Sequence, residues 1–112
     1  MLFFVLSLLG ACADDCVVTC SKLFGDGNGE CAIEVTGKTG EAGRAEMYDT
    51  CVQHCRDAMK QPGQRGDYDP YDPTSSLSTF ENRAEAELWV DCVDEATCDD
   101  LADDACPPVK AF

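Results

Sequence analysis

The chain has 112 residues, a formal net charge of −14 and nine cysteines, which together leave room for one small domain of the kind found in oxidising compartments. Its 22 acidic residues outweigh 8 basic ones, and such a surface repels nucleic acids and anionic lipid head groups. The composition therefore argues against a nucleic-acid-binding protein and favours a soluble, exported one that attracts basic partners or divalent cations.

Residues 1–13 form an uncharged, mostly apolar segment. Its length suits a signal peptide and falls short of the ~20 apolar residues that span a bilayer, although no Lys or Arg precedes it. Small residues on both sides of Cys12 predict signal-peptidase cleavage after Ala13. Alternatively, residues 9–12 (Leu-Gly-Ala-Cys) resemble the lipobox of bacterial lipoproteins, and this resemblance implies lipidation of Cys12 and a cell-envelope location. A third interpretation retains the segment as an assembly element.

Three helices are predicted in the rest of the chain. The first spans residues 14–24, where apolar residues recur every three or four positions behind two aspartates that suit a helix N-terminus. The second runs from a Thr39 cap to residue 59 or 60. The third opens at the capping-box pattern Ser78-x-x-Glu81, with Phe80 on its apolar face. Residues 99–104 add one short helical turn before Pro107.

The glycine-rich loop at residues 25–30 carries a partial calcium motif. Asp26, Asn28 and Glu30 match the first three ligand positions of an EF-hand loop, but the twelfth position is Gly37 where a bidentate glutamate is required. A plain turn is therefore the main prediction, and weak calcium binding is the alternative.

The single histidine lies on the second predicted helix. His54 and Asp57, close to Cys51 and Cys55, resemble the histidine region of secreted phospholipases A2, and the resemblance implies a calcium-dependent hydrolase. In that family the aspartate follows the histidine directly, whereas two residues separate them here. A solvent-exposed helical histidine is the main prediction, so no catalytic residue is assigned.

Residues 61–79 form a long acidic loop rich in proline and aspartate. Arg65 and Asp67 belong to an Arg-Gly-Asp adhesion motif, and Tyr68 and Tyr71 are predicted to be exposed aromatic residues beside it. Because loops carry most binding functions, these four residues are the predicted contact surface.

Two cysteine pairs of the form Cys-x3-Cys predict how the first two helices are joined. Residues four apart lie on one face of a helix, so antiparallel helices would place Cys16 against Cys55 and Cys20 against Cys51. Such a doubly linked helical hairpin resembles the small intermembrane-space chaperones of mitochondria, a resemblance that covers the four cysteines alone.

The other cysteines complete an even set. Without Cys12, eight remain for disulfides. Cys31, Cys92, Cys98 and Cys106 allow three pairings, which the sequence leaves open. We expect Cys31 to join one of the C-terminal three and so to tie the third helix to the hairpin.

These observations predict a mainly α fold, a disulfide-rich bundle of three helices within a single domain at residues 14–112. The predicted function is a non-catalytic, exported module with a structural or binding role at the cell envelope or surface, acting through a protein partner or self-assembly. A subunit of an extracellular filament is one alternative, and the phospholipase-type hydrolase is a weaker one. No cofactor is expected other than calcium.

Overall fold

The computed structural model describes residues 14–72, 79–110 and 112. Within them it contains four helices, α2 (Asp15–Phe24), α3 (Gly40–Met59), α4 (Arg83–Glu95) and α5 (Cys98–Ala102). The described ranges hold no strand, only an isolated bridge between Val35 and Lys38, so the mainly helical prediction is confirmed. No helix in these ranges is long and apolar enough to cross a membrane. The predicted leader, including Cys12, lies outside the described residues, as do loop positions 73–78.

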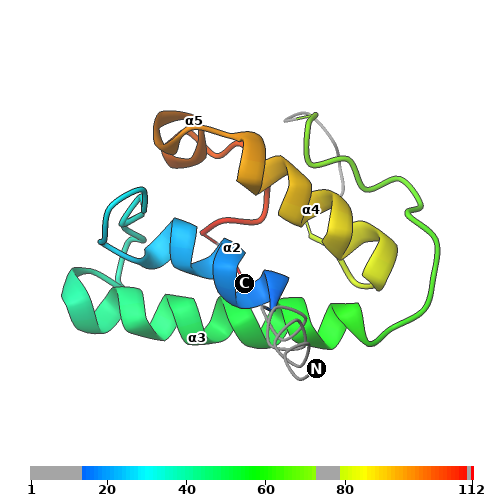
Figure 1. Cartoon of the computed structure of the whole chain (residues 1–112), viewed down its shortest axis with the longest axis horizontal. Helices are drawn as coiled ribbons and strands as arrows, with labels where there is room; N and C mark the ends of the chain where they lie inside the picture. The colour runs from blue at the N-terminus through cyan, green and yellow to red at the C-terminus, as the bar shows by residue number, and fades with distance from the viewer. Residues whose placement is uncertain (1–13, 73–78, 111) are drawn as a thin grey trace, which may run out of the picture.

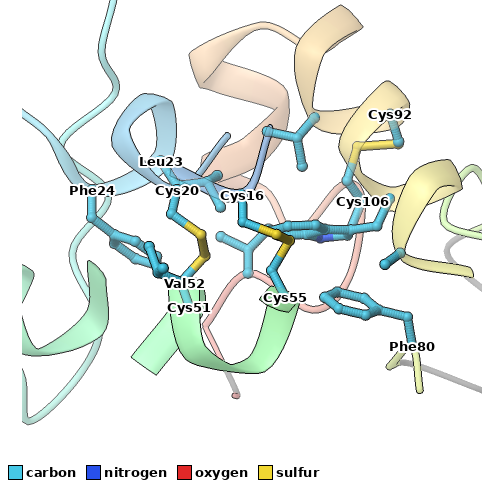
Figure 2. Packing of buried hydrophobic residues seen from close by; sticks show 14 of the residues in the cluster. Cys16, Cys20, Leu23, Phe24, Cys51, Val52, Cys55, Phe80, Cys92 and Cys106 are labelled. Carbon is cyan, nitrogen blue, oxygen red and sulfur yellow. A yellow bond between two sulfur atoms is a disulfide. The ribbon is translucent and has the colours of Figure 1, made fainter. Parts of the chain in front are cut away.

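Helices α2 and α3 form the predicted hairpin and run antiparallel (Figure 1). Two disulfides join them, Cys16–Cys55 with a Cα–Cα distance of 5.6 Å and Cys20–Cys51 with 5.9 Å. All four cysteines are buried in the interface (Figure 2). The pairing expected from the twin Cys-x3-Cys spacing is thus confirmed, and it places the apolar stripes of both helices face to face.

The remaining two disulfides tie the C-terminal half to this hairpin. Cys31, after the glycine-rich loop, pairs with Cys98 at the start of α5, one of the three partners that the sequence left open. Cys92 on α4 pairs with Cys106 and draws the C-terminal tail back onto that helix. Eight cysteines in four disulfides indicate an oxidising, extracellular compartment.

Asp14 begins α2 and connects it to α3. One carboxylate oxygen accepts a hydrogen bond from the Cys16 backbone N–H at 2.9 Å, which caps the helix. The other accepts one from Arg56 Nε on α3 at 2.6 Å. The start of α2 is therefore joined to the last turn of α3 by a polar contact beside the Cys16–Cys55 disulfide.

Lys22 connects α2 to the C-terminal end of α4. Its ammonium donates hydrogen bonds to three backbone carbonyls, those of Val93 at 2.6 Å, Asp94 at 3.0 Å and Ala96 at 2.8 Å. A helix end leaves its last carbonyls without intrahelical partners and carries partial negative charge, so a cation there is favourable. Lys22 thus holds α4 in place from the neighbouring helix.

Helix α4 begins later than predicted. Its N-cap is Asn82, whose side chain accepts a hydrogen bond from the Glu85 backbone N–H at 3.0 Å, while Glu85 Oε1 accepts one from the Glu81 N–H at 2.8 Å. The capping box expected at Ser78 and Glu81 is therefore wrong, because Asn82 and Glu85 offer an equally good cap four residues downstream. Phe80 precedes the helix but is fully buried.

The core lies between the hairpin and α4 and is rich in aromatic rings. Trp89 is fully buried, and its ring centroid lies 4.8 Å from that of Phe80. The indole Nε1 donates to the backbone oxygens of Cys106 at 3.1 Å and Pro108 at 3.0 Å. In the described part of the chain every buried side-chain N or O atom has a hydrogen-bond partner. The C-terminal tail is therefore part of the core's polar contacts.

Candidate functional site

A groove of about 340 Å³ opens where the loop before residue 72 meets the C-terminal end of α4, α5 and the tail. Its floor and walls are largely apolar and include the Cys92–Cys106 disulfide, together with Pro70, Tyr71, Ala96, Ala105 and Pro107. Three carboxylates, Glu95, Asp100 and Asp104, lie in its lining. The groove therefore combines an apolar surface with negative charge.

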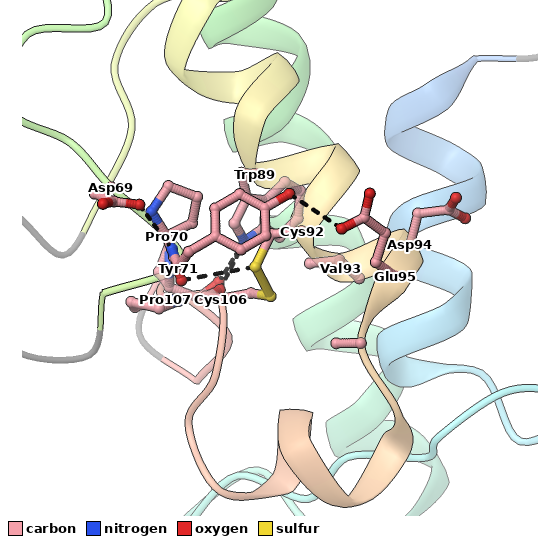
Figure 3. Close-up of a disulfide and its surroundings, with 12 residues drawn as sticks. Asp69, Pro70, Tyr71, Trp89, Cys92, Val93, Asp94, Glu95, Cys106 and Pro107 are labelled. Carbon is pink, nitrogen blue, oxygen red and sulfur yellow. Dashed lines mark hydrogen bonds between the residues drawn. A yellow bond between two sulfur atoms is a disulfide. The ribbon is translucent and has the colours of Figure 1, made fainter.

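Tyr71 forms one wall of the groove and is 53% exposed. Its backbone N–H donates to Asp69 Oδ1 at 3.0 Å, and its hydroxyl donates to Glu95 Oε1 at 3.4 Å (Figure 3). Partial burial, followed by the negative charge of Glu95 and Asp91, raises the pKa of the Tyr71 phenol above its ordinary value. The ring is thus held over the groove in a negative local potential.

The three carboxylates differ in their partners. Asp104 lies 3.3 Å from Lys110, whose ammonium also donates to the Ala102 carbonyl at 2.8 Å. Glu95 accepts only the Tyr71 hydroxyl, and Asp100 has no side-chain partner within the described ranges. Two of the three carboxylates, Glu95 and Asp100, therefore form no ion pair with a lysine or arginine of the described residues.

Tyr68 holds the part of the groove that the C-terminal tail forms at Pro107. This side chain is fully buried, and its hydroxyl donates to the Pro107 carbonyl at 2.6 Å. Burial, followed by the charges of Glu85 and Asp69, raises the pKa of the Tyr68 phenol well above its ordinary range. The prediction that Tyr68 is an exposed contact residue is wrong, because the ring packs against Phe80 and positions the tail instead.

The adhesion-type motif folds onto its own loop. Arg65 Nε donates to the Tyr68 carbonyl at 2.9 Å, and the guanidinium lies 3.6 Å from Asp69. Asp67 is exposed. Of the four predicted contact residues, only Tyr71 lies in the lining of the groove.

The residues of the partial calcium motif make local contacts. Glu30 Oε1 accepts a hydrogen bond from the Gly27 backbone N–H at 2.7 Å, which closes the turn. Asp26 lies 3.6 Å from Arg44, and Asn28 is exposed. The described residues contain no group of three or more His, Cys, Asp or Glu side chains placed to hold a metal ion. The geometry here is that of a side-chain-closed turn.

His54 is partly buried, contrary to the exposed position predicted for it. Its Nε2 lies 3.1 Å from the Phe80 carbonyl oxygen and 3.3 Å from the Thr79 hydroxyl, and its ring packs edge-on against Phe80. Asp57 instead accepts a hydrogen bond from Gln53 at 2.9 Å. Helical spacing alone could not reveal this, since the residues that cover His54 come from a segment 25 and 26 positions away.

The groove itself has no signature in the sequence. Its residues come from three separated segments that the Cys92–Cys106 disulfide and the Tyr68 contact bring together. A comparison with known protein families, curated proteins and solved structures finds no match to this chain.

Proposed function

We propose that this protein is an exported, non-catalytic binding module that recognises a basic protein partner. The observation that supports the proposal is the groove beside Tyr71, in which an apolar floor adjoins Glu95 and Asp100, two carboxylates that form no ion pair with any described lysine or arginine. Aromatic side chains are enriched at protein interfaces, and complementary charge speeds association and sets specificity. A net charge of −14 makes a basic partner the favoured one.

The disulfides support a binding role by their placement. The Cys92–Cys106 disulfide lines the groove. The Cys31–Cys98 disulfide links the first residue of α5, a helix that also contributes to the groove, to the segment after α2. A site held rigid before binding loses less conformational entropy when the partner arrives. The four cross-links thus favour a pre-organised surface in a compartment where disulfides persist.

Export and processing form part of the proposal. Cleavage after Ala13 gives a secreted protein, and lipidation of Cys12 gives one anchored at the cell envelope. The intact mass of the protein recovered from its producing cell distinguishes the two, since lipidation adds acyl chains to a chain that begins at Cys12. A mass that includes residues 1–13 would contradict both routes.

Binding of charged peptides tests the proposed function directly. Fluorescence anisotropy of the disulfide-intact protein with labelled peptides rich in Lys and Arg is expected to show saturable binding that weakens as salt rises from 50 to 300 mM, because salt screens exposed charges. Peptides of the same length rich in Glu are the control and should not bind. The absence of binding to every basic peptide would refute the proposal.

A further inference from the structure

The geometry of the groove points to a more specific ligand. We propose that it binds an extended segment of a basic protein in which one aliphatic side chain enters the apolar floor while flanking Lys or Arg side chains pair with Glu95 and Asp100. This inference rests on the proposed function and adds the site and the recognition pattern.

The size of the groove fits a short peptide segment. Its volume of about 340 Å³ lies near the lower end of the roughly 300–1,000 Å³ typical of ligand sites. Two small apolar residues, Ala96 and Ala105, line it together with Tyr71 and Pro107. An aliphatic side chain placed there would bury apolar surface against the disulfide and the proline ring.

The charges around the groove select a cation. Glu95 and Asp100 lie within reach of the same space, and no lysine or arginine in the described ranges forms an ion pair with either. Residues 83–104 contain nine acidic residues and one basic residue, Arg83, so the wider surface adds to the same negative field. A second copy of this chain, with a net charge of −14, would be repelled, as would anionic lipid.

Tyr71 completes the recognition pattern. Its side chain is exposed, and its hydroxyl lies 3.4 Å from Glu95 Oε1 at the groove (Figure 3). An exposed aromatic face attracts the guanidinium of arginine or the ammonium of lysine. The same residue therefore contacts both the apolar and the cationic parts of the segment.

The tail and the end of α4, which form two walls of the groove, are anchored by hydrogen bonds from the core and from α2, which favours selective binding. The Trp89 indole holds the backbone at Cys106 and Pro108, and the Tyr68 hydroxyl holds Pro107. Lys22 fixes the backbone at Ala96 from the opposite side. A wall anchored at both ends presents one shape, so peptides that lack the apolar side chain leave its floor unfilled.

The experiment uses the full, disulfide-intact protein and the labelled probe Gly-Arg-Leu-Lys-Gly. The double variant Glu95→Gln/Asp100→Asn is expected to bind at least fivefold more weakly than the parent protein. Glu41→Gln/Asp49→Asn removes the same charge from exposed positions on α3 and should change affinity less than twofold. Tryptophan fluorescence and the denaturation midpoint confirm that both variants remain folded.

The outcomes separate the inference from the function on which it rests. Equal losses in the two double variants would mean that net charge alone drives binding and would overturn the groove assignment while leaving the basic partner. Equal affinity for Gly-Arg-Gly-Lys-Gly would overturn the role of the apolar floor. If no basic peptide binds, the proposed function fails together with the inference.

Discussion

Replacing Lys22 by methionine tests the link between α2 and α4. The change keeps a long apolar side chain on α2 but removes the ammonium that donates to the carbonyls of Val93, Asp94 and Ala96. The C-terminal end of α4 then loses both its hydrogen-bond donor and its compensating charge. We expect the helix end to fray and the free energy of unfolding to fall.

The size of the loss follows from the contacts. A hydrogen bond that involves a charged group contributes about 1.5–3 kcal/mol net, and a cation at a helix C-terminus about 0.3–1 kcal/mol. The three bonds share one ammonium, and the Val93 carbonyl keeps a second partner in the Ala96 N–H. Asp94 is exposed, so its carbonyl can turn to water. The expected loss is therefore about 2 kcal/mol.

Guanidinium denaturation with the disulfides intact measures this loss. Trp89 is the single tryptophan and is fully buried, so its fluorescence reports unfolding of the core. The matched control is Lys38→Met, because Lys38 pairs with Glu46 on the exposed surface and its removal changes the net charge equally. Surface pairs contribute about 0–1 kcal/mol. Equal, small losses in both variants would refute the proposed anchoring of α4.

Three further predictions concern the cross-links, the buried phenol and the helix cap. Removal of the Cys16–Cys55 disulfide by double alanine substitution should lower the free energy of unfolding by about 3 kcal/mol in guanidinium denaturation. The loss is limited to this size because the nested Cys20–Cys51 disulfide still confines both helices in the unfolded chain. An unchanged midpoint would contradict the stabilising role of the Cys16–Cys55 disulfide. Tyr68 ionises near pH 10 in the unfolded chain but at higher pH when folded, so the unfolded state loses its proton first and stability should fall above pH 10 by up to about 1.4 kcal/mol per pH unit. Tyr68→Phe should flatten that fall, as measured by denaturation between pH 8 and 11, and an identical slope in both proteins would refute the assignment. Asn82→Ala should cost about 1 kcal/mol through loss of the α4 cap, and a thermal melt that does not change would argue against the observed helix start.

The hairpin could be predicted because its information is local. Cysteines four residues apart share a helix face, so two such pairs can form two disulfides between the helices, and if the helices run antiparallel Cys16 meets Cys55 and Cys20 meets Cys51. The helix periods around Cys16 and Cys51 agree with that geometry, and the structure has both bonds.

The tyrosine-containing loop shows why the site could not be predicted in full. Tyr68 and Tyr71 occur in nearly identical contexts, each between aspartates or beside a proline. Tyr68 is fully buried and its hydroxyl donates to the Pro107 carbonyl of the tail, whereas Tyr71 is 53% exposed. That distinction depends on the path of the tail, which the Cys92–Cys106 disulfide determines, and the sequence left this pairing as one of three.

The start of α4 was predicted wrongly for a different reason. Two cap-like patterns follow one another in residues 78–85, and either one satisfies the local rules. Asn82 also donates from its side-chain amide to the Gln64 carbonyl at 2.8 Å, a long-range bond that favours the second pattern. Tertiary contact therefore decides between caps of similar local quality.

Chemical-shift mapping by NMR tests the central claim most directly, namely that a rigid, disulfide-linked groove binds a basic segment. Titration of the isotope-labelled protein with Gly-Arg-Leu-Lys-Gly is expected to shift backbone amides at Tyr71, Glu95, Ala96 and residues 100–107, with those of α3 unchanged. Shifts spread evenly over acidic residues on all helices, or none at saturating peptide, would contradict the claim.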